Sequence, residues 1–319
     1  MKEVILVTGA NGQIGSVLVP KLQEIYGLNS VIASDLIGNS SFTGVFEYLD
    51  VLNIKRLQEI VRTYKVTQIY HLAAILSAKG EQNPLETWDI NMITFLNVLE
   101  ISRINKIDKV FYPSSIAVFG SEANREYTPQ ATCLNPSTVY GISKASGENW
   151  AQYYTLRYNK DVRSLRFPGI ISHQTLPGGG TTDYAVDIYH KAVTDQNFSC
   201  YLSQDTMLPM MYIDDAIRGA IELMEAPKNV LKSSTAYNIA AVSYTPEEVA
   251  NSIKTYYPSF QMTYAPDYRQ HIASNWPKVI NDNEARNDWK WEHEYDLELI
   301  TQSMLKNLRL QYKQKEVLK

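Results

Sequence analysis

Short apolar runs alternate with longer segments of helical periodicity through the first half of the chain. The run 4–10 is rich in β-branched residues and ends in a glycine-rich turn, and residues 14–26 follow with apolar positions at helical spacing. Strand-like runs recur at 30–35, 45–49, 67–74, 109–115 and 162–167, and helical segments at 53–64, 86–104 and 139–159 separate most of them. This alternation predicts an α/β fold built on a doubly wound parallel sheet.

Composition excludes several classes of partner. The chain has 319 residues, of which 30 are basic and 34 acidic, and no basic run suits a nucleic-acid backbone or an anionic membrane. No stretch approaches the roughly 18 consecutive apolar residues of a membrane span, and the chain starts in a strand pattern without a signal region, so we expect a cytoplasmic protein. Two cysteines and five scattered histidines show no ligand spacing, which predicts neither a disulfide nor a metal site.

A glycine turn joins the first strand to the first helix. Glycine allows a tight turn and lets the backbone approach a pyrophosphate, while the start of the helix supplies amide groups and positive potential. A purely local strand-ending turn is the alternative interpretation. The context of strand, turn and helix favours a dinucleotide site that includes Gly9, Asn11, Gly12, Gln13, Ile14 and Gly15.

An acidic residue ends the second predicted strand. Asp35 lies 20 residues after Gly15, where a carboxylate can accept hydrogen bonds from both ribose hydroxyls of the adenosine half and would repel a 2′-phosphate. A solvated turn aspartate is the alternative. The offset predicts NAD rather than NADP, with Asp35 and the adjoining Leu36 as cofactor-binding residues.

The periodic pattern changes after about Pro168. Residues 176–182 read LPGGGTT, and helical patterns return at 185–194 and 213–225. We therefore expect residues 1–167 to form an NAD-binding Rossmann domain and residues 168–319 to form a smaller carboxyl-terminal substrate lobe. An apolar segment near 236–240 is expected to return to the main sheet.

A tyrosine and a lysine four residues apart carry the strongest chemical signal. Tyr140 and Lys144 share one helix face, so the ammonium can favour the deprotonated phenol and make it a base near neutral pH. Ser115 ends a predicted strand 25 residues earlier and can hydrogen-bond and orient the same substrate oxygen. These three residues are the predicted catalytic group of an oxidoreductase.

Five motifs stand in order along the chain: TGANGQIG at 8–15, Asp50-Val51, HLAA at 71–74, the SS–VFG stretch at 114–120 and YGISK at 140–144. In these motifs and their order, the chain resembles the extended short-chain dehydrogenase/reductases over nearly its whole length. The resemblance implies that Asp50 and Val51 flank the adenine. It also places Leu72, Ala73 and Ala74 along the cofactor's central portion and Ile170 near the nicotinamide.

The carboxyl-terminal half is similar to the L-threonine 3-dehydrogenases of the short-chain type. The similarity rests on RFPGIIS at 166–172, PGGGTTDYAV at 177–186, SNWP at 274–277 and DNEARNDW at 282–289, although Asn275 stands where a serine is expected. It implies NAD-dependent oxidation of L-threonine at C3 to 2-amino-3-oxobutanoate, with Tyr140 as base. The substrate contacts implied are Ser77, Ser115, Tyr140, Gly180, Thr181, Thr182, Asp183 and Trp276.

Two other functions share the dinucleotide motifs. A UDP-sugar 4-epimerase or related sugar-nucleotide enzyme would keep its NAD bound and need a roomy basic cleft, and a non-catalytic NAD-sensing protein would bind the cofactor without turnover. The resemblance also implies a homodimer that pairs through the helical segments 86–104 and 139–159. Release of free NADH with threonine distinguishes the dehydrogenase from both alternatives.

Overall fold

Parallel pairing of short buried strands builds the main sheet. The computed structural model describes residues 3–38, 42–233 and 236–317. Seven strands lie side by side, all parallel, in the order β10-β6-β5-β4-β1-β2-β3. This order confirms the predicted doubly wound α/β fold. The strands are β1 (Ile5–Thr8), β2 (Val31–Asp35), β3 (Val45–Tyr48), β4 (Gln68–His71), β5 (Lys109–Ser115), β6 (Asp161–Phe167) and β10 (Tyr237–Asn238).

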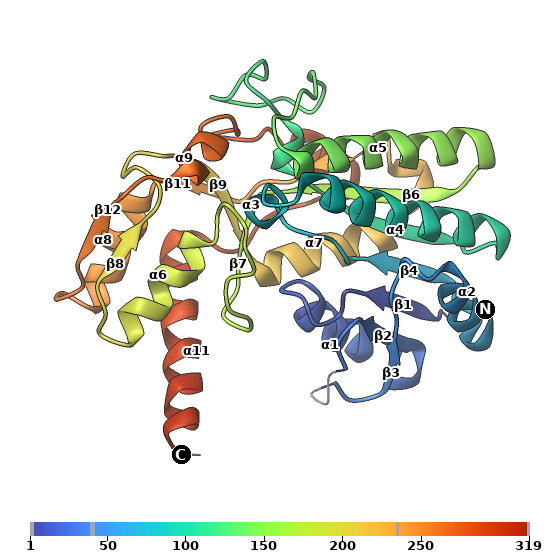
Figure 1. Ribbon diagram of the computed structural model, residues 1–319, viewed down its shortest axis with the longest axis horizontal. Coiled ribbons are helices and arrows are strands. Elements are labelled where there is room, and N and C mark those ends of the chain that lie inside the picture. The colour runs from blue at the N-terminus through green and yellow to red at the C-terminus, as the bar shows by residue number, and fades with distance from the viewer. Residues whose placement is uncertain (1–2, 39–41, 234–235, 318–319) are drawn as a thin grey trace.

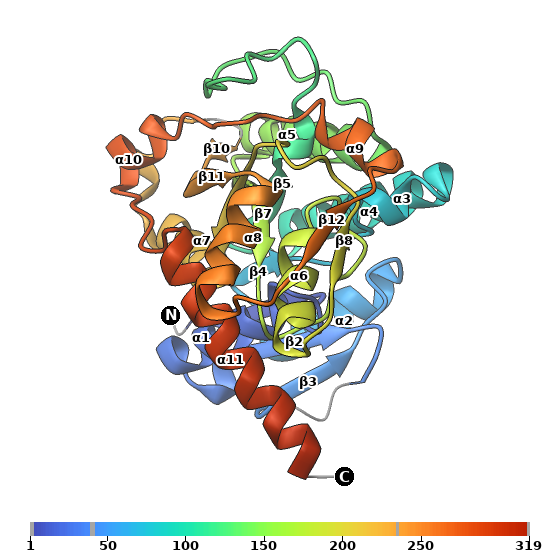
Figure 2. The same ribbon diagram turned by 90° about the vertical axis from the view of Figure 1, so that its left-hand side faces the viewer.

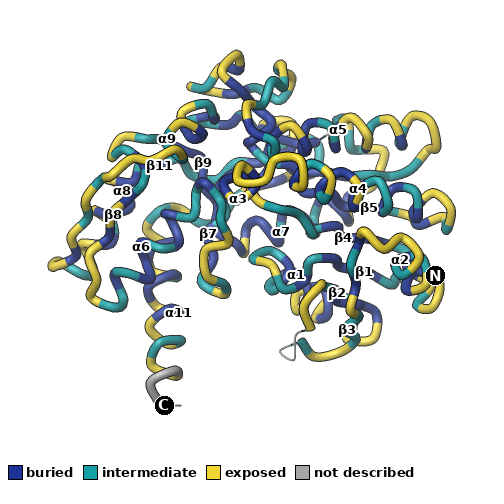
Figure 3. Tube along the Cα trace, in the orientation of Figure 1, coloured by how far each residue is buried: buried dark blue, intermediate teal, exposed yellow. Residues whose placement is uncertain are grey.

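Helices cover both faces of this sheet because both faces are apolar. The side chain of Leu6 packs in a core with α2 (Ile54–Tyr64), α4 (Pro84–Ile104) and α5 (Val139–Tyr158). Its neighbour Val7 packs in a second core with α1 (Gly15–Tyr26) and α7 (Ile213–Glu225). Figure 1 shows these two helical layers on either side of the strands. In Figure 3 most of the strands between them are coloured as buried, whereas the edge strand β3 is partly exposed.

Several predicted boundaries were wrong by a few residues. The strand predicted over 67–74 ends at His71, because the chain leaves the sheet after the hydrogen bond from the Leu72 amide to the Thr8 carbonyl. The strand predicted over 4–10 ends at Thr8, since Gly9 has a positive φ of 72°. The helix predicted from residue 86 begins at Pro84, a residue suited to the first helical turn.

The chain leaves the main sheet after β6 to build a second, smaller group of elements. β7 (Gly169–Ile171), β9 (Leu208–Tyr212) and β11 (Val242–Tyr244) form a three-stranded sheet, and β8 (Phe198–Cys200) pairs with β12 (Met262–Tyr264). Within the segment expected to return, Tyr237 and Asn238 pair with β6 of the main sheet. Besides α7, the helices of this half are α6 (Tyr184–Val193), α8 (Pro246–Tyr256), α9 (Tyr268–Ala273), α10 (Asn283–Trp289) and α11 (Leu297–Val317).

Short helical elements complete the chain. α3 (Ser77–Gly80) lies between β4 and α4, and single 3₁₀ turns occur at η1 (Leu28–Ser30), η2 (Ile116–Val118) and η3 (Lys228–Val230). α11 packs against α6 and α8, and its carboxyl-terminal end projects from the body of the molecule (Figure 2). Among the helices in the described part of the chain, none is long and apolar enough to cross a membrane.

Candidate active site

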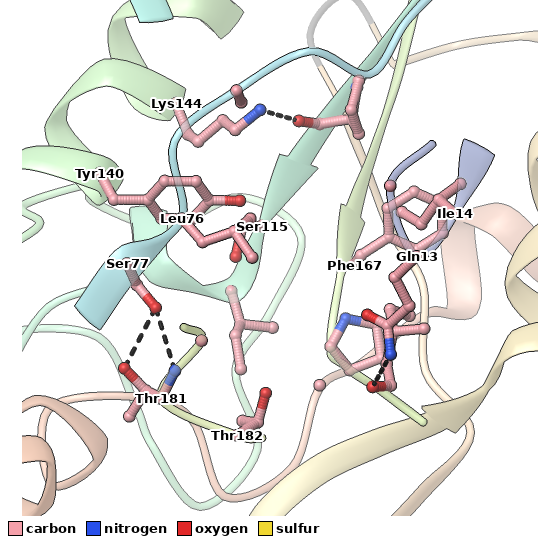
Figure 4. A pocket seen from close by; sticks show the side chains of 18 of the residues that line it. Gln13, Ile14, Leu76, Ser77, Ser115, Tyr140, Lys144, Phe167, Thr181 and Thr182 are labelled. Atoms are coloured by element: carbon pink, nitrogen blue, oxygen red, sulfur yellow. Dashed lines mark hydrogen bonds between the residues drawn. The ribbon is translucent and has the colours of Figure 1, made fainter. Parts of the chain in front are cut away.

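A cavity of about 230 Å³ lies at the carboxyl edge of the main sheet, where ligands bind in open α/β folds (Figure 4). Its walls come from the glycine turn after β1, the ends of β5 and β6, the start of α5, and the glycine-rich segment before α6. Sixteen of the predicted site residues line it: Gly9, Gly12, Gln13, Ile14, Gly15, Leu72, Ala74, Ser77, Ser115, Tyr140, Lys144, Ile170, Gly180, Thr181, Thr182 and Asp183. Trp276, also predicted, closes one side and is buried.

Two glycines of the turn stand where no side chain fits. At Gly9, φ is 72° and a β-carbon would lie 2.7 Å from the amide nitrogen of Ala73. At Gly15, a β-carbon would lie 2.5 Å from the carbonyl oxygen of Gly9. The α1 helix begins here without a side-chain cap, and its first residue, Gly15, lines the cavity, which places the positive end of the helix at the cavity wall. This bare backbone fits the close approach of a cofactor pyrophosphate.

The remaining predicted cofactor residues lie outside the cavity, toward the neighbouring strand ends. The Asp35 carboxylate accepts hydrogen bonds from the amides of Asn11 at 2.9 Å and Ile37 at 3.3 Å. Asp50 follows β3 and accepts a hydrogen bond from the Leu52 amide. The predicted cofactor residues thus fall into two groups. One lines the cavity with the catalytic residues, and the second lies outside it, as binding the two ends of an elongated dinucleotide would require. The second group consists of Asn11, Asp35, Leu36, Asp50, Val51 and Ala73.

Local structure brings the three predicted catalytic residues together. β5 ends at Ser115, and α5 begins directly before Tyr140, with the Thr138 side chain capping the helix by accepting from the Gly141 amide. The β-carbon of any other residue at Gly141 would lie 2.1 Å from the Ala117 carbonyl, so glycine lets the helix approach this close. Figure 4 shows the hydroxyl groups of Tyr140 and Ser115 facing the same space.

Burial controls the ionisation of this group. It raises the pKa of Tyr140 to about 12, and a side-chain hydrogen bond with Ser115 opposes part of the rise. Burial also lowers the pKa of Lys144 to about 7. The Lys144 nitrogen donates to the Pro113 carbonyl at 2.7 Å and lies 5.5 Å from the centre of the Tyr140 ring. The spacing of Tyr140 and Lys144 predicts that the ammonium lowers the phenol pKa; in the protein alone, the loss of solvent has the larger effect and the phenol pKa rises.

α3 and the glycine-rich segment, which carry several of the predicted substrate residues, form a cover on one side of the cavity. The Ser77 hydroxyl lies 3.1 Å from the Thr181 hydroxyl and accepts from the Thr181 amide at 3.2 Å, as the dashed lines in Figure 4 show. The Lys79 amide donates to the Gly179 carbonyl at 3.1 Å. α3 and the glycine-rich segment are therefore joined by three contacts.

Asp183 has a structural use that sequence reasoning missed. Its carboxylate accepts hydrogen bonds from the amides of Gly179 and Gly180, both at 2.8 Å. Burial raises its pKa, and these backbone donors oppose the rise. The carboxylate predicted to meet a substrate ammonium thus also holds the glycine-rich segment in place.

Sequence reasoning also left out several residues of the cavity wall: Leu76, Pro113, Ser114, Ile116, Phe167, Pro168 and Gly169. Three of them lie in RFPGIIS, which was noticed only for its resemblance. The Gln13 side chain donates to the Ile170 carbonyl at 3.2 Å, which ties the glycine turn to that segment. No group of three or more His, Cys, Asp or Glu residues suited to a metal ion occurs in the part of the chain that the structure describes; a metal-free enzyme stays a prediction.

Comparison with known proteins identifies similar chains over nearly the full length. The model of the NAD dependent epimerase/dehydratase family matches residues 5–240. An uncharacterized epimerase/dehydratase of Staphylococcus saprophyticus is 45% identical over 94% of this chain and 95% of its own. A partial-consensus L-threonine 3-dehydrogenase has a TM-score of 0.95 and 50% identity, covering 96% of this chain and 99% of its own.

Three further solved structures are similar to this chain. The holo form of a GalE-like L-threonine dehydrogenase from Cupriavidus necator has a TM-score of 0.94 and 49% identity, covering 96% of this chain and 99% of its own. An L-threonine 3-dehydrogenase from a metagenome, described as monomeric, is 45% identical, with a TM-score of 0.94 and coverage of 97% and 99%. A UDP-glucose 4-epimerase from Thermotoga maritima is 21% identical, with a TM-score of 0.83 and coverage of 97% and 99%, and shares the fold alone.

Proposed function

The chain belongs to the NAD-dependent epimerase/dehydratase family, and from this premise we propose that it is an NAD-dependent L-threonine 3-dehydrogenase. The family confirms the predicted cofactor. One observation supports the substrate most strongly: solved threonine dehydrogenases match this chain at 49–50% identity over 96% of its length. That coverage includes the carboxyl-terminal half, which supplies the glycine-rich segment and Trp276 to the cavity.

The proposed reaction removes a proton and a hydride from the C3 carbinol of threonine and leaves 2-amino-3-oxobutanoate. Bound NAD supplies the hydride acceptor and, when oxidised, a positively charged ring. Tyr140 takes the hydroxyl proton as general base, and Ser115 hydrogen-bonds the same oxygen and orients it. Lys144 lies one helical turn from the phenol and would hold the cofactor ribose, where its protonated form would favour the deprotonated phenol.

The polarity of the cavity supports a small zwitterionic substrate. Hydroxyl groups of Ser77, Thr181 and Thr182 line the side opposite Gln13 (Figure 4). The joined cover formed by α3 and the glycine-rich segment would exclude water from the reacting atoms.

A UDP-sugar 4-epimerase is the second candidate and fits the cavity less well. Such a substrate carries a diphosphate in addition to that of NAD, which calls for cationic partners. Lys144 is the one lysine or arginine among the described residues that line the cavity. A third candidate, an NAD-sensing protein without turnover, leaves the assembled Ser115, Tyr140 and Lys144 unexplained.

The deciding experiment follows NADH formation by absorbance with the purified protein, NAD and L-threonine. L-Serine, L-allo-threonine and UDP-galactose are tested separately. A threonine-dependent rise supports the proposal. No rise with any amino acid, together with conversion of UDP-galactose to UDP-glucose, identifies an epimerase, and NAD binding without any turnover identifies a sensor.

We also propose a homodimer that pairs through α4 and α5. The two helices pack against each other and keep large apolar side chains exposed on their outer surface. Leu85 is 81% exposed and Leu156 is 76% exposed. The other exposed apolar residues on these helices are Ile93, Ile104, Ile142, Trp150, Tyr153 and Tyr158. An apolar surface of this kind is typical of an interface between protein chains.

A further inference from the structure

A buried ion pair joins β6 to α5, the helix that carries Tyr140 and Lys144. The Arg166 guanidinium on β6 donates to the Glu148 carboxylate on α5 at 2.9 and 2.8 Å, and both side chains are at least 96% buried. The Ser114 hydroxyl on β5 donates to the same carboxylate at 2.5 Å. Ser114 and Arg166 are paired in the β5–β6 register, so two adjacent strands bind one carboxylate of the helix.

The row of contacts continues across the sheet. Arg166 also donates to the Asn238 side chain at 3.1 Å and to the Gln130 carbonyl at 3.0 Å. Asn238 is the register partner of Arg166 on β10 and donates to the Asn281 carbonyl at 3.1 Å. One buried arginine therefore connects the catalytic helix with the end strand and with the segment that follows Trp276.

The position of the pair relates it to the catalytic group. Glu148 lies four residues after Lys144 and eight after Tyr140, on the same face of α5. Ser114 immediately precedes Ser115 on β5, and the carbonyl before Ser114 accepts the Lys144 hydrogen bond. Three consecutive positions of one strand thus contact three successive turns of one helix.

We propose that Glu148 and Arg166 are positioning residues that fix the register of α5 on β5, and thereby the alignment of Tyr140 with Ser115 and of Lys144 with the cofactor. The inference rests on the proposed catalytic role of those three residues. A buried ion pair contributes little net stability, because desolvation offsets its attraction. Fixed geometry has a larger effect on rate, since a displacement of about 1 Å can lower a rate by roughly 100-fold.

Among the described residues, no carboxylate forms an ion pair or hydrogen bond with Lys144, whose nitrogen donates to a carbonyl. The groups facing its nitrogen are the Tyr112 ring, the Pro113 carbonyl, Tyr140 on its own helix and His71 on β4. His71 is neutral, because burial lowers its pKa to about 3. Removing the charge of either partner of the Glu148–Arg166 pair should therefore shift the pKa of Lys144, in opposite directions for the two partners. Arg166→Gln leaves a free carboxylate that raises the pKa of Lys144, and Glu148→Gln leaves a free guanidinium that lowers it.

The test compares Glu148→Gln, Arg166→Gln and the double variant E148Q/R166Q with a matched control. Arg163 is equally buried on β6, pairs with Asp161 at 2.8 Å and donates to the Leu223 carbonyl, but lies near the start of the strand. Arg163→Gln should lower the melting temperature and leave kcat unchanged. The two single variants at the pair should lower kcat about 10- to 100-fold while the threonine KM changes less than about threefold.

The double variant keeps the test valid if a single variant folds poorly. It buries no unpaired charge, so its melting temperature should recover while kcat stays low. Recovery of kcat together with stability would overturn the proposal. If the wild-type protein does not oxidise threonine, the titration of Lys144, followed by NMR of ¹³C-labelled lysine, still decides. Opposite shifts in the two single variants support the proposal, and unchanged titration overturns it.

Discussion

The side-chain nitrogen of Lys144 is held by the carbonyl oxygen of Pro113, at a distance of 2.7 Å. The lysine is therefore anchored to β5, and its hydrogen bond goes to this carbonyl rather than to Tyr140. Anchoring leaves the ammonium buried with one neutral acceptor, which is why its pKa falls to about 7. A group that titrates near neutral pH can respond to the charge of a bound cofactor or substrate.

This burial makes a prediction about stability and pH. The pKa of Lys144 falls from its ordinary 10.5 to about 7 on folding, so between these values the unfolded chain binds more protons than the folded one. The stability that this group contributes is therefore fully present above pH 10.5 and is lost as the pH falls from 10.5 through 7. Over that range the free energy of unfolding changes by at most about 1.4 kcal/mol per pH unit. Urea unfolding should show wild type gaining stability relative to Lys144→Met between about pH 7 and pH 9. Parallel stability curves would contradict the assigned burial.

Replacing Tyr140 with phenylalanine should remove the base and keep the fold. General acid–base groups contribute about 100- to 10,000-fold, so kcat should fall by that range while the dissociation constant for NADH stays within about threefold. Fluorescence titration with NADH measures the binding. Tyr153→Phe is the matched control, because Tyr153 lies on the same helix and is 47% exposed. Near-normal turnover by Tyr140→Phe would reject the assignment.

The parallel sheet was predictable because its strands carry their signal locally. β-Branched apolar runs ending in Gly9 and Asp35 can be recognised without knowing what packs on them. The strand predicted over 67–74 was too long for a physical reason. Leu72 and Ala74 are apolar because they line the cavity, and periodicity cannot distinguish a cavity wall from a sheet.

The buried ion pair was not predicted, since charged residues give no local sign that they will be buried. Glu148 and Arg166 are 18 positions apart and meet only when β6 pairs with β5 beneath α5. The effect of burial on Tyr140 and Lys144 was missed for the same reason. Residue spacing shows which groups share a helix face, but the solvent around them depends on the packed tertiary structure.

The glycine-rich segment should act in closing the cavity. Gly179 has a φ of 99°, so Gly179→Ala costs about 1 kcal/mol of strain and brings a β-carbon 3.2 Å from that of Lys79 in α3. We expect kcat and the threonine KM to change together. Gly27→Ala is the control, since its φ is 91° and its β-carbon would meet nothing within 4 Å. Equal kcat and KM values in the two variants would indicate that the segment is an ordinary surface loop.

Asp35 should determine the choice between NAD and NADP. Its carboxylate ends β2 and would repel a 2′-phosphate, so wild type should use NAD with the higher kcat/KM. Asp35→Ser keeps a hydroxyl acceptor and removes the charge, and the preference for NAD should fall at least about tenfold. Initial rates with both cofactors measure this ratio. A lower KM for NADP in the wild-type protein would refute the prediction.

The proposed homodimer can be tested directly. Proteins that are similar in sequence need not share an oligomeric state, and one of the similar threonine dehydrogenases is described as monomeric. Leu156 is 76% exposed on the outer face of α5, so Leu156→Glu places a charge in the proposed interface and should convert a dimer to a monomer. Light scattering after size-exclusion chromatography reports the mass. Leu310→Glu is the control, since Leu310 is 52% exposed on α11, away from α4 and α5. A wild-type protein with the mass of one chain would show that the apolar face of α4 and α5 does not pair in this protein.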